Sequence, residues 1–251
     1  SIVNSISLKE GEELFLESGR LLSPVTVAYE TYGTLNEDKS NAVLVCHALT
    51  GSANAAGYHS EMSKAGWWDE MIGPGRAFDT DKYYVISSTI LERCHGPPGP
   101  SSMDPFTGNH YARRFPVVTI KDMIKVQKRL LGHLGVDRLY CVTGGSLGGM
   151  QVLEWAVTYP EMVDRIIPIA TSGRITPMAI AFNTIARFAI TKDPTYADGD
   201  YYGKAAPKDG LAIVRMAGYI TYLSDAAFHK KFARRCATFE GIYDFNGFFE
   251  V

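Results

Sequence analysis

The fold is decided by one central stretch of the sequence, Leu139-Tyr140-Cys141-Val142-Thr143-Gly144-Gly145-Ser146-Leu147-Gly148-Gly149-Met150-Gln151-Val152-Leu153-Glu154-Trp155. Its first five residues predict a buried strand, and residues 150–157 predict a helix. The pattern Gly144-x-Ser146-x-Gly148 between them is that of a nucleophile elbow, a sharp turn that holds a serine at the top of a sheet. The glycines lack the Cβ atoms that would clash there, and the helix directs its first N–H groups toward the serine. Ser146 is therefore the candidate nucleophile.

Two alternatives exist for this turn. It could be an ordinary glycine-rich connection with an incidental serine, since such a five-residue pattern arises by chance in roughly one chain in ten of this length. It could also bind phosphate, but the chain has neither the GK[ST] nor the GxGxxG spacing that phosphate-binding turns use. The position of the pattern, directly between a strand and a helix, favours the elbow.

Strand and helix patterns alternate on both sides of the elbow. Strands are expected over residues 42–46, 83–87 and 165–170. The first of these is apolar on both faces, as a central parallel strand should be. An amphipathic helix is expected over residues 120–134, with Thr119 as its N-cap and Gly135 as its stop. This alternation is typical of βαβ units in a parallel sheet, so the predicted fold class is α/β.

The two ends of the chain differ from this middle. Short strands are expected over residues 13–17 and 25–30. From residue 172 onward the strand pattern fades, and helices are expected over residues 180–190 and 211–223. We therefore expect the N-terminal portion of a core domain over residues 1–172 and an incomplete helical lid over residues 173–251.

The overall composition narrows the class of protein. The chain has 251 residues, with 25 Lys and Arg against 27 Asp and Glu, so it lacks the basic excess of a nucleic-acid binder. No apolar run approaches the roughly 18 residues of a membrane span, and the first residues show no secretory signal. The cysteines lie too far apart for a CxxC site, which favours a reducing cytoplasm. They are Cys46, Cys94, Cys141 and Cys236. We find no metal-ligand cluster and no cofactor-binding loop in the sequence.

Acyl-transfer chemistry at Ser146 needs two further backbone donors. One is normally the N–H of the residue after the nucleophile, here Leu147, and the other comes from a loop after an earlier strand. We expect Leu49, in the loop that follows the strand ending at Cys46, to supply the second donor. His47 lies in the same loop, and we expect it to brace that loop, because in a fold with this elbow the histidine follows the serine in the chain.

The remaining partners of a catalytic serine are missing. His229 is the only histidine after Ser146, and its segment predicts an exposed helix. No acid after Ser146 follows a strand pattern convincingly. The expected acid and histidine are therefore not found in these 251 residues.

Further motifs accompany the elbow. They are His47-Ala48-Leu49-Thr50-Gly51, Trp67-Trp68 with Gly73-Pro74-Gly75, Gly99-Pro100-Ser101-Ser102, Phe115-Pro116-Val117-Val118-Thr119-Ile120-Lys121-Asp122-Met123 and Ile220-Thr221-Tyr222-Leu223-Ser224-Asp225. With the elbow, this set resembles the homoserine O-acetyltransferase family over nearly the whole chain. The resemblance implies the α/β-hydrolase fold with a helical lid. It also implies transfer of an acetyl or succinyl group from acyl-CoA to the hydroxyl of homoserine, in methionine biosynthesis, with acyl-CoA as co-substrate and no separate cofactor.

The resemblance also implies roles for single residues. Ser146 would be the nucleophile of a ping-pong mechanism. Arg215 matches the family's lid arginine, which holds the carboxylate of the amino-acid substrate, and Tyr222 matches a tyrosine that lines the same pocket. The alternatives are a surface or ion-pairing role for Arg215 and core packing for Tyr222. The resemblance further implies a homodimer, with neither membrane nor nucleic acid as a partner.

The chain departs from the family pattern in two places. Residues 91–98 differ from the glycine-rich run that family members have before Gly99, so homoserine, serine and other acceptors stay open. The family's acid and histidine come later than the last residue here. This implies that C-terminal strands are absent, that the sheet has an exposed edge and that these 251 residues alone are inactive. The alternative functions are a serine esterase of the same fold and a truncated homologue that has lost catalysis.

Overall fold

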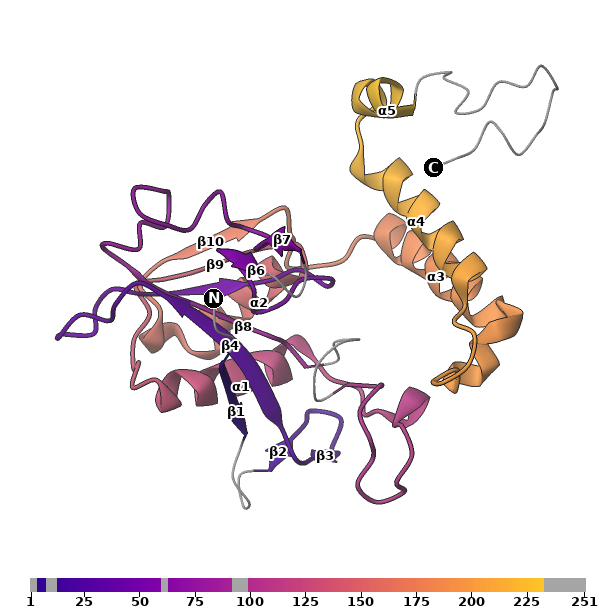
Figure 1. Cartoon of the computed structure of the whole chain (residues 1–251), viewed down its shortest axis with the longest axis horizontal. Helices are drawn as coiled ribbons and strands as arrows, with labels where there is room; N and C mark the ends of the chain where they lie inside the picture. Colours follow the sequence, from indigo (N-terminus) through magenta and orange to yellow (C-terminus); the bar gives the residue numbers. More distant parts are fainter. Residues whose placement is uncertain (1–3, 8–12, 60–62, 92–98, 233–251) are drawn as a thin grey trace. The chain divides into compact units, whose positions relative to one another are not determined.

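The chain divides into two compact units, residues 1–174 and residues 175–251 (Figure 1). The structure is a computed structural model, and it describes residues 4–7, 13–59, 63–91 and 99–232. The sequence predicts the boundary at residue 172. We describe each unit by itself.

The first unit is built on a six-stranded sheet with the order β1-β4-β8-β5-β9-β10. The strands are β1 (Asn4–Ser7), β4 (Thr26–Tyr32), β5 (Ala42–Cys46), β8 (Tyr84–Ser88), β9 (Cys141–Gly145) and β10 (Ile166–Ile169). The last four strands in the order are parallel, whereas β4 runs antiparallel to β8 and β1 runs antiparallel to β4. The predicted parallel sheet is therefore confirmed, with two antiparallel strands added at one edge.

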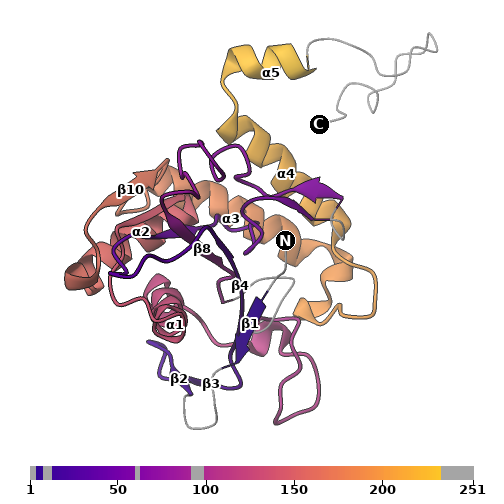
Figure 2. The same ribbon diagram turned by 60° about the vertical axis from the view of Figure 1, so that its left-hand side comes forward.

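The core lies on both faces of this sheet. Every residue of β5 is buried, as expected of a central strand. Leu44 packs in a cluster that includes Leu131 and Trp155, from the helices α1 (Ile120–His133) and α2 (Leu147–Thr158). Val43 and Val45 point to the opposite face, where segments between residues 55 and 78 cover the sheet. The two helices pack against each other (Figure 2).

Helix α1 begins and ends where its sequence predicts. Thr119 is the N-cap: its hydroxyl accepts a hydrogen bond from the Asp122 N–H, and the Asp122 carboxylate accepts one from the Thr119 N–H. This reciprocal capping box satisfies two backbone donors that the helix leaves unpaired. Gly135, with φ of 70°, follows the last turn, so the predicted stop is also confirmed.

Several element boundaries differ from the sequence-based expectation. The strand expected over residues 13–17 is only β2 (Leu14–Phe15), because the chain turns at Gly19 and pairs back with β3 (Leu21–Leu22). The strand expected over residues 25–30 is β4 and reaches Tyr32. Two more short strands, β6 (Tyr58–His59) and β7 (Lys64–Ala65), form a separate pair. Single-turn 3-10 helices are η2 (Ala112–Arg114) and η3 (Pro160–Met162).

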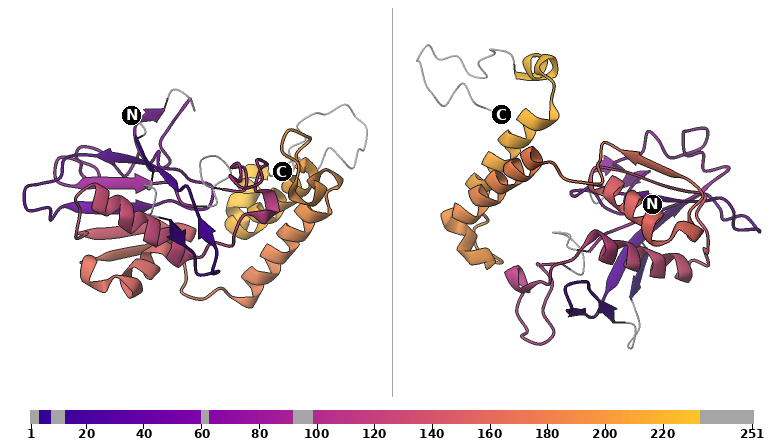
Figure 3. Two further views of the ribbon diagram at one scale, coloured as in Figure 1. Left: turned by 90° about the horizontal axis from the view of Figure 1, so that it is seen from below. Right: turned by 180° about the vertical axis from the view of Figure 1, so that it is seen from behind.

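The described part of the second unit is helical (Figure 3). It contains α3 (Pro177–Lys192), η4 (Pro194–Gly199), α4 (Lys208–Tyr222) and α5 (Asp225–Phe232). Helices α3 and α4 correspond to the two helices expected from the sequence, each a little longer. They pack closely because Gly210 has no side chain: a Cβ there would lie 2.6 Å from the Ala189 carbonyl oxygen. The Asp193 carboxylate joins the two helices by accepting from the Gly210 N–H. Among the described residues, no helix combines the length and the apolar character needed to cross a bilayer.

Candidate active site

Ser146 lies at a strained turn between β9 and α2. Its φ and ψ are 54° and −119°, a conformation that costs a residue other than glycine about 1–3 kcal/mol. The turn is held by a 3.0 Å hydrogen bond from the Ser146 N–H to the Ile169 carbonyl oxygen. The residue is exposed, and no described residue forms a hydrogen bond with its Oγ. This is the geometry that the elbow pattern predicts.

Two glycines of the motif allow β9 and α2 to approach the end of β5. A Cβ at Gly144 would lie 2.5 Å from the Cys46 carbonyl oxygen, and a Cβ at Gly148 would lie only 2.1 Å from the same atom. Strand pairing also places Cys46 beside Gly144. The loop that follows Cys46 is therefore brought against the first turn of α2.

His47 braces this loop, as its place in the sequence suggested. The ring is buried, and its Nε2 accepts a 3.2 Å hydrogen bond from the Ile90 N–H. Nδ1 must then carry the proton, and it lies 2.6 Å from the Ala48 carbonyl oxygen. Both ring nitrogens are thus occupied by backbone groups, an arrangement that does not suit a catalytic base.

The same bonds orient the Leu49 N–H. The Ala48 carbonyl oxygen accepts from His47 and, at 2.9 Å, from the Gly51 N–H. In a trans peptide the N–H points opposite to the C=O, so the Leu49 N–H points away from these two donors. No described residue accepts from it. The Leu147 N–H, at the first position of α2, has no intrahelical partner either.

A buried polar chain connects this loop to the helices. The Gln151 Nε2 lies 3.5 Å from the His47 carbonyl oxygen and 3.3 Å from the Leu147 carbonyl oxygen. The Gln151 Oε1 accepts from the Gln127 Nε2 at 2.8 Å, and the Gln127 Oε1 accepts from the Trp155 indole at 2.8 Å. The sequence motif contains Gln151 but predicts no role for it, because an amide side chain carries no chemical signature of its own.

The two nearby thiols are not suited to act as nucleophiles. Cys46 is fully buried, and burial raises the pKa of its thiol to about 12, with only a partial offset from the Gln127 amide. Burial likewise raises the pKa of Cys141, against the influence of Arg165. Both side chains therefore stay protonated near neutral pH and behave as small apolar residues.

Arg215 and Tyr222 lie on α4 in the second unit. They are seven residues apart, so they share one face of the helix two turns apart. Tyr222 is 87% exposed within the described part of the chain. Arg215 is exposed, and within the described residues it forms no ion pair. Their approach to Ser146 stays a prediction.

His229 is a surface residue, as the sequence indicates. It lies on α5, its side chain is 76% exposed, and its Nε2 is 3.8 Å from the Asp225 carboxylate one turn earlier. No hydrogen bond joins Ser146 to a histidine or an acid in the described part of the chain. The same residues hold no group of three or more His, Cys, Asp or Glu side chains placed to bind a metal ion.

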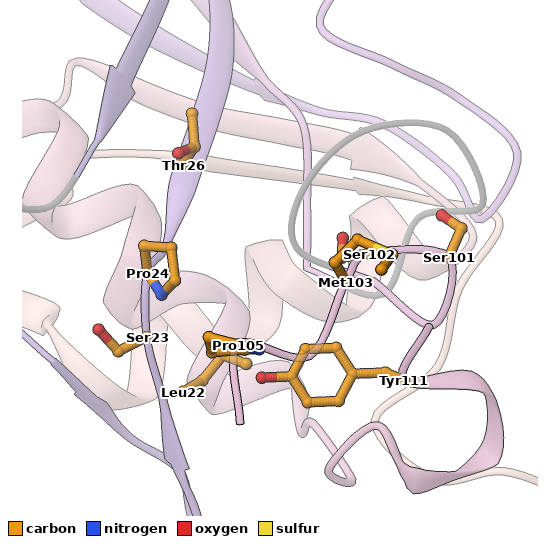
Figure 4. A pocket seen from close by; sticks show the side chains of 9 residues that line it. All are labelled: Leu22, Ser23, Pro24, Thr26, Ser101, Ser102, Met103, Pro105 and Tyr111. Atoms are coloured by element: carbon orange, nitrogen blue, oxygen red, sulfur yellow. The ribbon is translucent and has the colours of Figure 1, made fainter. Parts of the chain in front are cut away.

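One pocket of about 400 Å³ lies apart from this turn (Figure 4). Its walls come from residues 22–26 and from the loop over residues 101–111, and Ser146 does not line it. The polar side chains in it are hydroxyls, including Ser101, Ser102 and Tyr111. It therefore offers hydrogen bonds to a ligand but no carboxylate or imidazole for acid–base chemistry.

The chain is similar to known proteins over most of its length. Residues 41–246 match the family model of the alpha/beta hydrolase fold. A homoserine O-acetyltransferase of Deferribacter desulfuricans is 67% identical over 96% of this chain, which covers 64% of that protein. One of Geobacter metallireducens is 51% identical over 100% of this chain, which covers 68% of that protein. The chain belongs to the homoserine O-acetyltransferase family.

Solved structures agree with membership in the homoserine O-acetyltransferase family. The homoserine O-acetyltransferase of Bacillus anthracis superposes with a TM-score of 0.87 at 36% identity, over 94% of this chain and 64% of that one. Esterase E22 superposes with a TM-score of 0.84 at 38% identity, over 92% of this chain and 64% of that one. The family and the α/β-hydrolase fold predicted from the motifs are thus confirmed. The chain spans about two thirds of the length of these proteins.

Proposed function

We propose that the protein carrying this chain transfers an acetyl group from acetyl-CoA to the hydroxyl of homoserine. The observation that carries the proposal is the strained, exposed Ser146 at the start of α2, in a chain 67% identical to a homoserine O-acetyltransferase. Acetyl is favoured over succinyl because the relatives bear the acetyltransferase name. The resemblance further supports a cytoplasmic homodimer acting on small molecules.

The reaction proceeds in two acyl transfers. In the first, Ser146 Oγ bonds to the thioester carbonyl carbon while a histidine from outside the described residues takes the hydroxyl proton. The C–S bond then breaks, the proton passes to the CoA thiolate, and an acetyl ester of Ser146 is left. In the second, the homoserine hydroxyl attacks that ester and gives its proton to the same histidine, which passes it to Ser146 Oγ as O-acetylhomoserine departs.

Backbone donors stabilise both tetrahedral intermediates in this proposal. The N–H groups of Leu49 and Leu147 donate to the oxyanion, and the loss of one such donor typically costs about 3 kcal/mol of transition-state stabilisation. Arg215 holds the homoserine carboxylate through its planar guanidinium, and Tyr222 lines the same pocket. The second unit acts as a lid that excludes water, so that transfer outcompetes hydrolysis.

The proposal is tested by following CoA release from acetyl-CoA by the full-length protein, with and without homoserine. We expect release to depend on homoserine, and succinyl-CoA to react more slowly. Ser146→Ala should lower turnover by at least about a thousandfold, because it removes the nucleophile. Retained turnover in that variant would exclude Ser146 from the role.

A serine esterase is the second candidate, because esterase E22 shares the fold at 38% identity. It would release CoA, or hydrolyse a simple acetyl ester, at a rate that does not change with homoserine. A homologue without catalysis would form no acetyl-enzyme. Intact mass measurement after acetyl-CoA is added, which detects one acetyl group on Ser146, separates that case from the other two.

A further inference from the structure

The polar chain from Trp155 to the loop after β5 has a fixed direction. An indole N–H can only donate, so the Gln127 amide must present its oxygen to Trp155 and its nitrogen to Gln151. The Gln151 oxygen is thereby occupied, and its amide nitrogen must face the other way. That nitrogen has two hydrogens, and two carbonyl oxygens lie within reach, those of His47 and Leu147.

These two carbonyl groups belong to the two halves of the proposed oxyanion hole. His47 immediately precedes the Ala48–Leu49 peptide, whose N–H is one donor, and Leu147 carries the other donor. All three polar side chains of the chain are buried, with Gln127 at 1% exposure and Gln151 and Trp155 at 0%. Water is thus not at hand to replace a lost hydrogen bond, so removing the Gln151 amide changes the geometry between loop and helix.

We infer that Gln151 is a positioning residue, whose side-chain amide clamps the loop over residues 47–51 to the first turn of α2 and sets the spacing of the two oxyanion donors. This inference rests on the proposed function, because it assumes an oxyanion at Ser146. Gln151 does not touch the reacting atoms in this arrangement. It acts through the His47–Ala48 and Leu147–Gly148 peptides, which adjoin the peptides that carry the Leu49 and Leu147 N–H groups.

The glycine contacts make the spacing sensitive to this clamp. At Gly148, a Cβ would lie 3.1 Å from the His47 carbonyl oxygen, so helix and loop already meet backbone to backbone. Without the amide, the side-chain bond from α2 to the His47 carbonyl oxygen is lost. A shift of a few tenths of an ångström then weakens both donors in the transition state while ground-state binding is kept.

The test compares three variants of the full-length protein. Gln151→Met keeps the length of the side chain and removes its hydrogen bonds. Gln151→Glu keeps an acceptor for Gln127 but presents an oxygen to the two carbonyl oxygens. Gln127→Met is the matched control, because it removes three buried hydrogen bonds, to Gln151, Trp155 and Cys46, and leaves the Gln151 nitrogen beside its two carbonyl groups.

Three measurements are made on each variant: urea unfolding, kcat and KM for p-nitrophenyl acetate and acetyl-CoA, and inhibition by a trifluoromethyl ketone. The ketone forms an oxyanion with an active serine and therefore reports on the donors directly. We expect both Gln151 variants to lower kcat by roughly 10- to 100-fold with little change in KM, and to weaken the ketone by a similar factor. Gln127→Met should destabilise the protein to a similar extent but lower kcat by less than about threefold.

Other outcomes overturn the inference. Equal losses of kcat in Gln127→Met and Gln151→Met would show that Gln151 has a purely structural role. A change in KM with unchanged kcat, or an unchanged affinity for the ketone, would show the same. A wild type that hydrolyses the ester but ignores homoserine contradicts the proposed acceptor and leaves the Gln151 comparison intact. A wild type that reacts with neither the ester nor the ketone overturns both proposals.

Discussion

At the scale of single residues, the tightest contact in the site belongs to a glycine. A Cβ at Gly148 would meet the Cys46 carbonyl oxygen at 2.1 Å and the carbonyl carbon at 2.8 Å. Both are backbone atoms at the end of β5, so no side chain can rotate to make room. We expect Gly148→Ala to lower the free energy of unfolding by about 3 kcal/mol in a urea titration and to disturb the loop over residues 47–51.

Gly132 provides the control for this substitution. It lies in α1, where a Cβ would meet no atom within 4 Å outside the backbone of its own helix, and its φ is not positive. Gly132→Ala should therefore stabilise the protein by roughly 0.5 kcal/mol, as alanine does in a helix. If Gly148→Ala and Gly132→Ala unfold at the same urea concentration, the close approach of α2 to β5 is wrong.

The sequence predicted those site residues that belong to a recognisable sequence motif. Ser146, with the two motif glycines, follows from the elbow, and the bracing role of His47 follows from chain order. Gln151 could not be predicted, because a glutamine in a helix hydrogen-bonds to whatever the fold places beside it. Its role depends on a contact between residues 104 positions apart, which no local pattern contains.

At the scale of elements, the start of α1 carries a buried charge. The Asp122 carboxylate is 0% exposed and accepts from the Glu17 N–H, the Thr119 N–H and the Lys125 ammonium group. Burial alone would raise the pKa of Asp122, but the hydrogen bonds from these three groups outweigh it and hold the pKa below its usual value. The ionised carboxylate is thus part of the folded structure.

This carboxylate makes a predictable contribution to acid stability. An Asp in the unfolded chain has a pKa of about 3.9, so the stabilisation by Asp122 is fully present above that pH and is lost as the pH falls through the lower folded pKa. We expect Asp122→Asn to lower the free energy of unfolding by about 2 kcal/mol at neutral pH, and the difference from the wild type to shrink in acid. Urea unfolding at a series of pH values measures this.

Asp164 is the control, since its pKa is also lowered, by the Arg138 guanidinium first, but the pair is exposed to solvent. Asp164→Asn should have a smaller effect at neutral pH, because exposed ion pairs contribute little. A difference between wild type and Asp122→Asn that stays constant down to strongly acid pH would contradict the role of the ionised carboxylate.

Element boundaries were harder to predict than the elements themselves. The helix expected from residue 150 begins at Leu147, and the strand expected over residues 139–143 runs to Gly145. Two consecutive glycines favour a loop when only the local sequence is considered. In the structure, however, Gly144 and Gly145 pair with Pro168 and Ile169 of β10. The neighbouring strand, which comes later in the chain, makes them part of the sheet.

At the scale of the whole molecule, the sheet ends at an apolar edge. β10 is the last strand in the order, and Ile166, Ile167 and Ile169 are 38%, 46% and 40% exposed. The sequence predicted such an edge from the resemblance alone. An unpaired strand with exposed branched apolar residues is a template for pairing with another chain, and a lysine on such a strand opposes that pairing.

The whole-molecule prediction follows from this edge. We expect the 251-residue polypeptide to self-associate in sedimentation velocity, and Ile167→Lys to reduce that association, because the charge cannot be buried between two strands.

This chain covers 64% of a close relative. In the full-length protein, the same substitution should instead lower the free energy of unfolding, because additional chain that covers β10 would bury the lysine. A monomeric 251-residue polypeptide with isoleucine at this position would contradict the free edge. A full-length protein that Ile167→Lys leaves unaffected would contradict the covering of β10. Opposite effects of one substitution on the two polypeptides would identify β10 as the strand on which the rest of the fold is built.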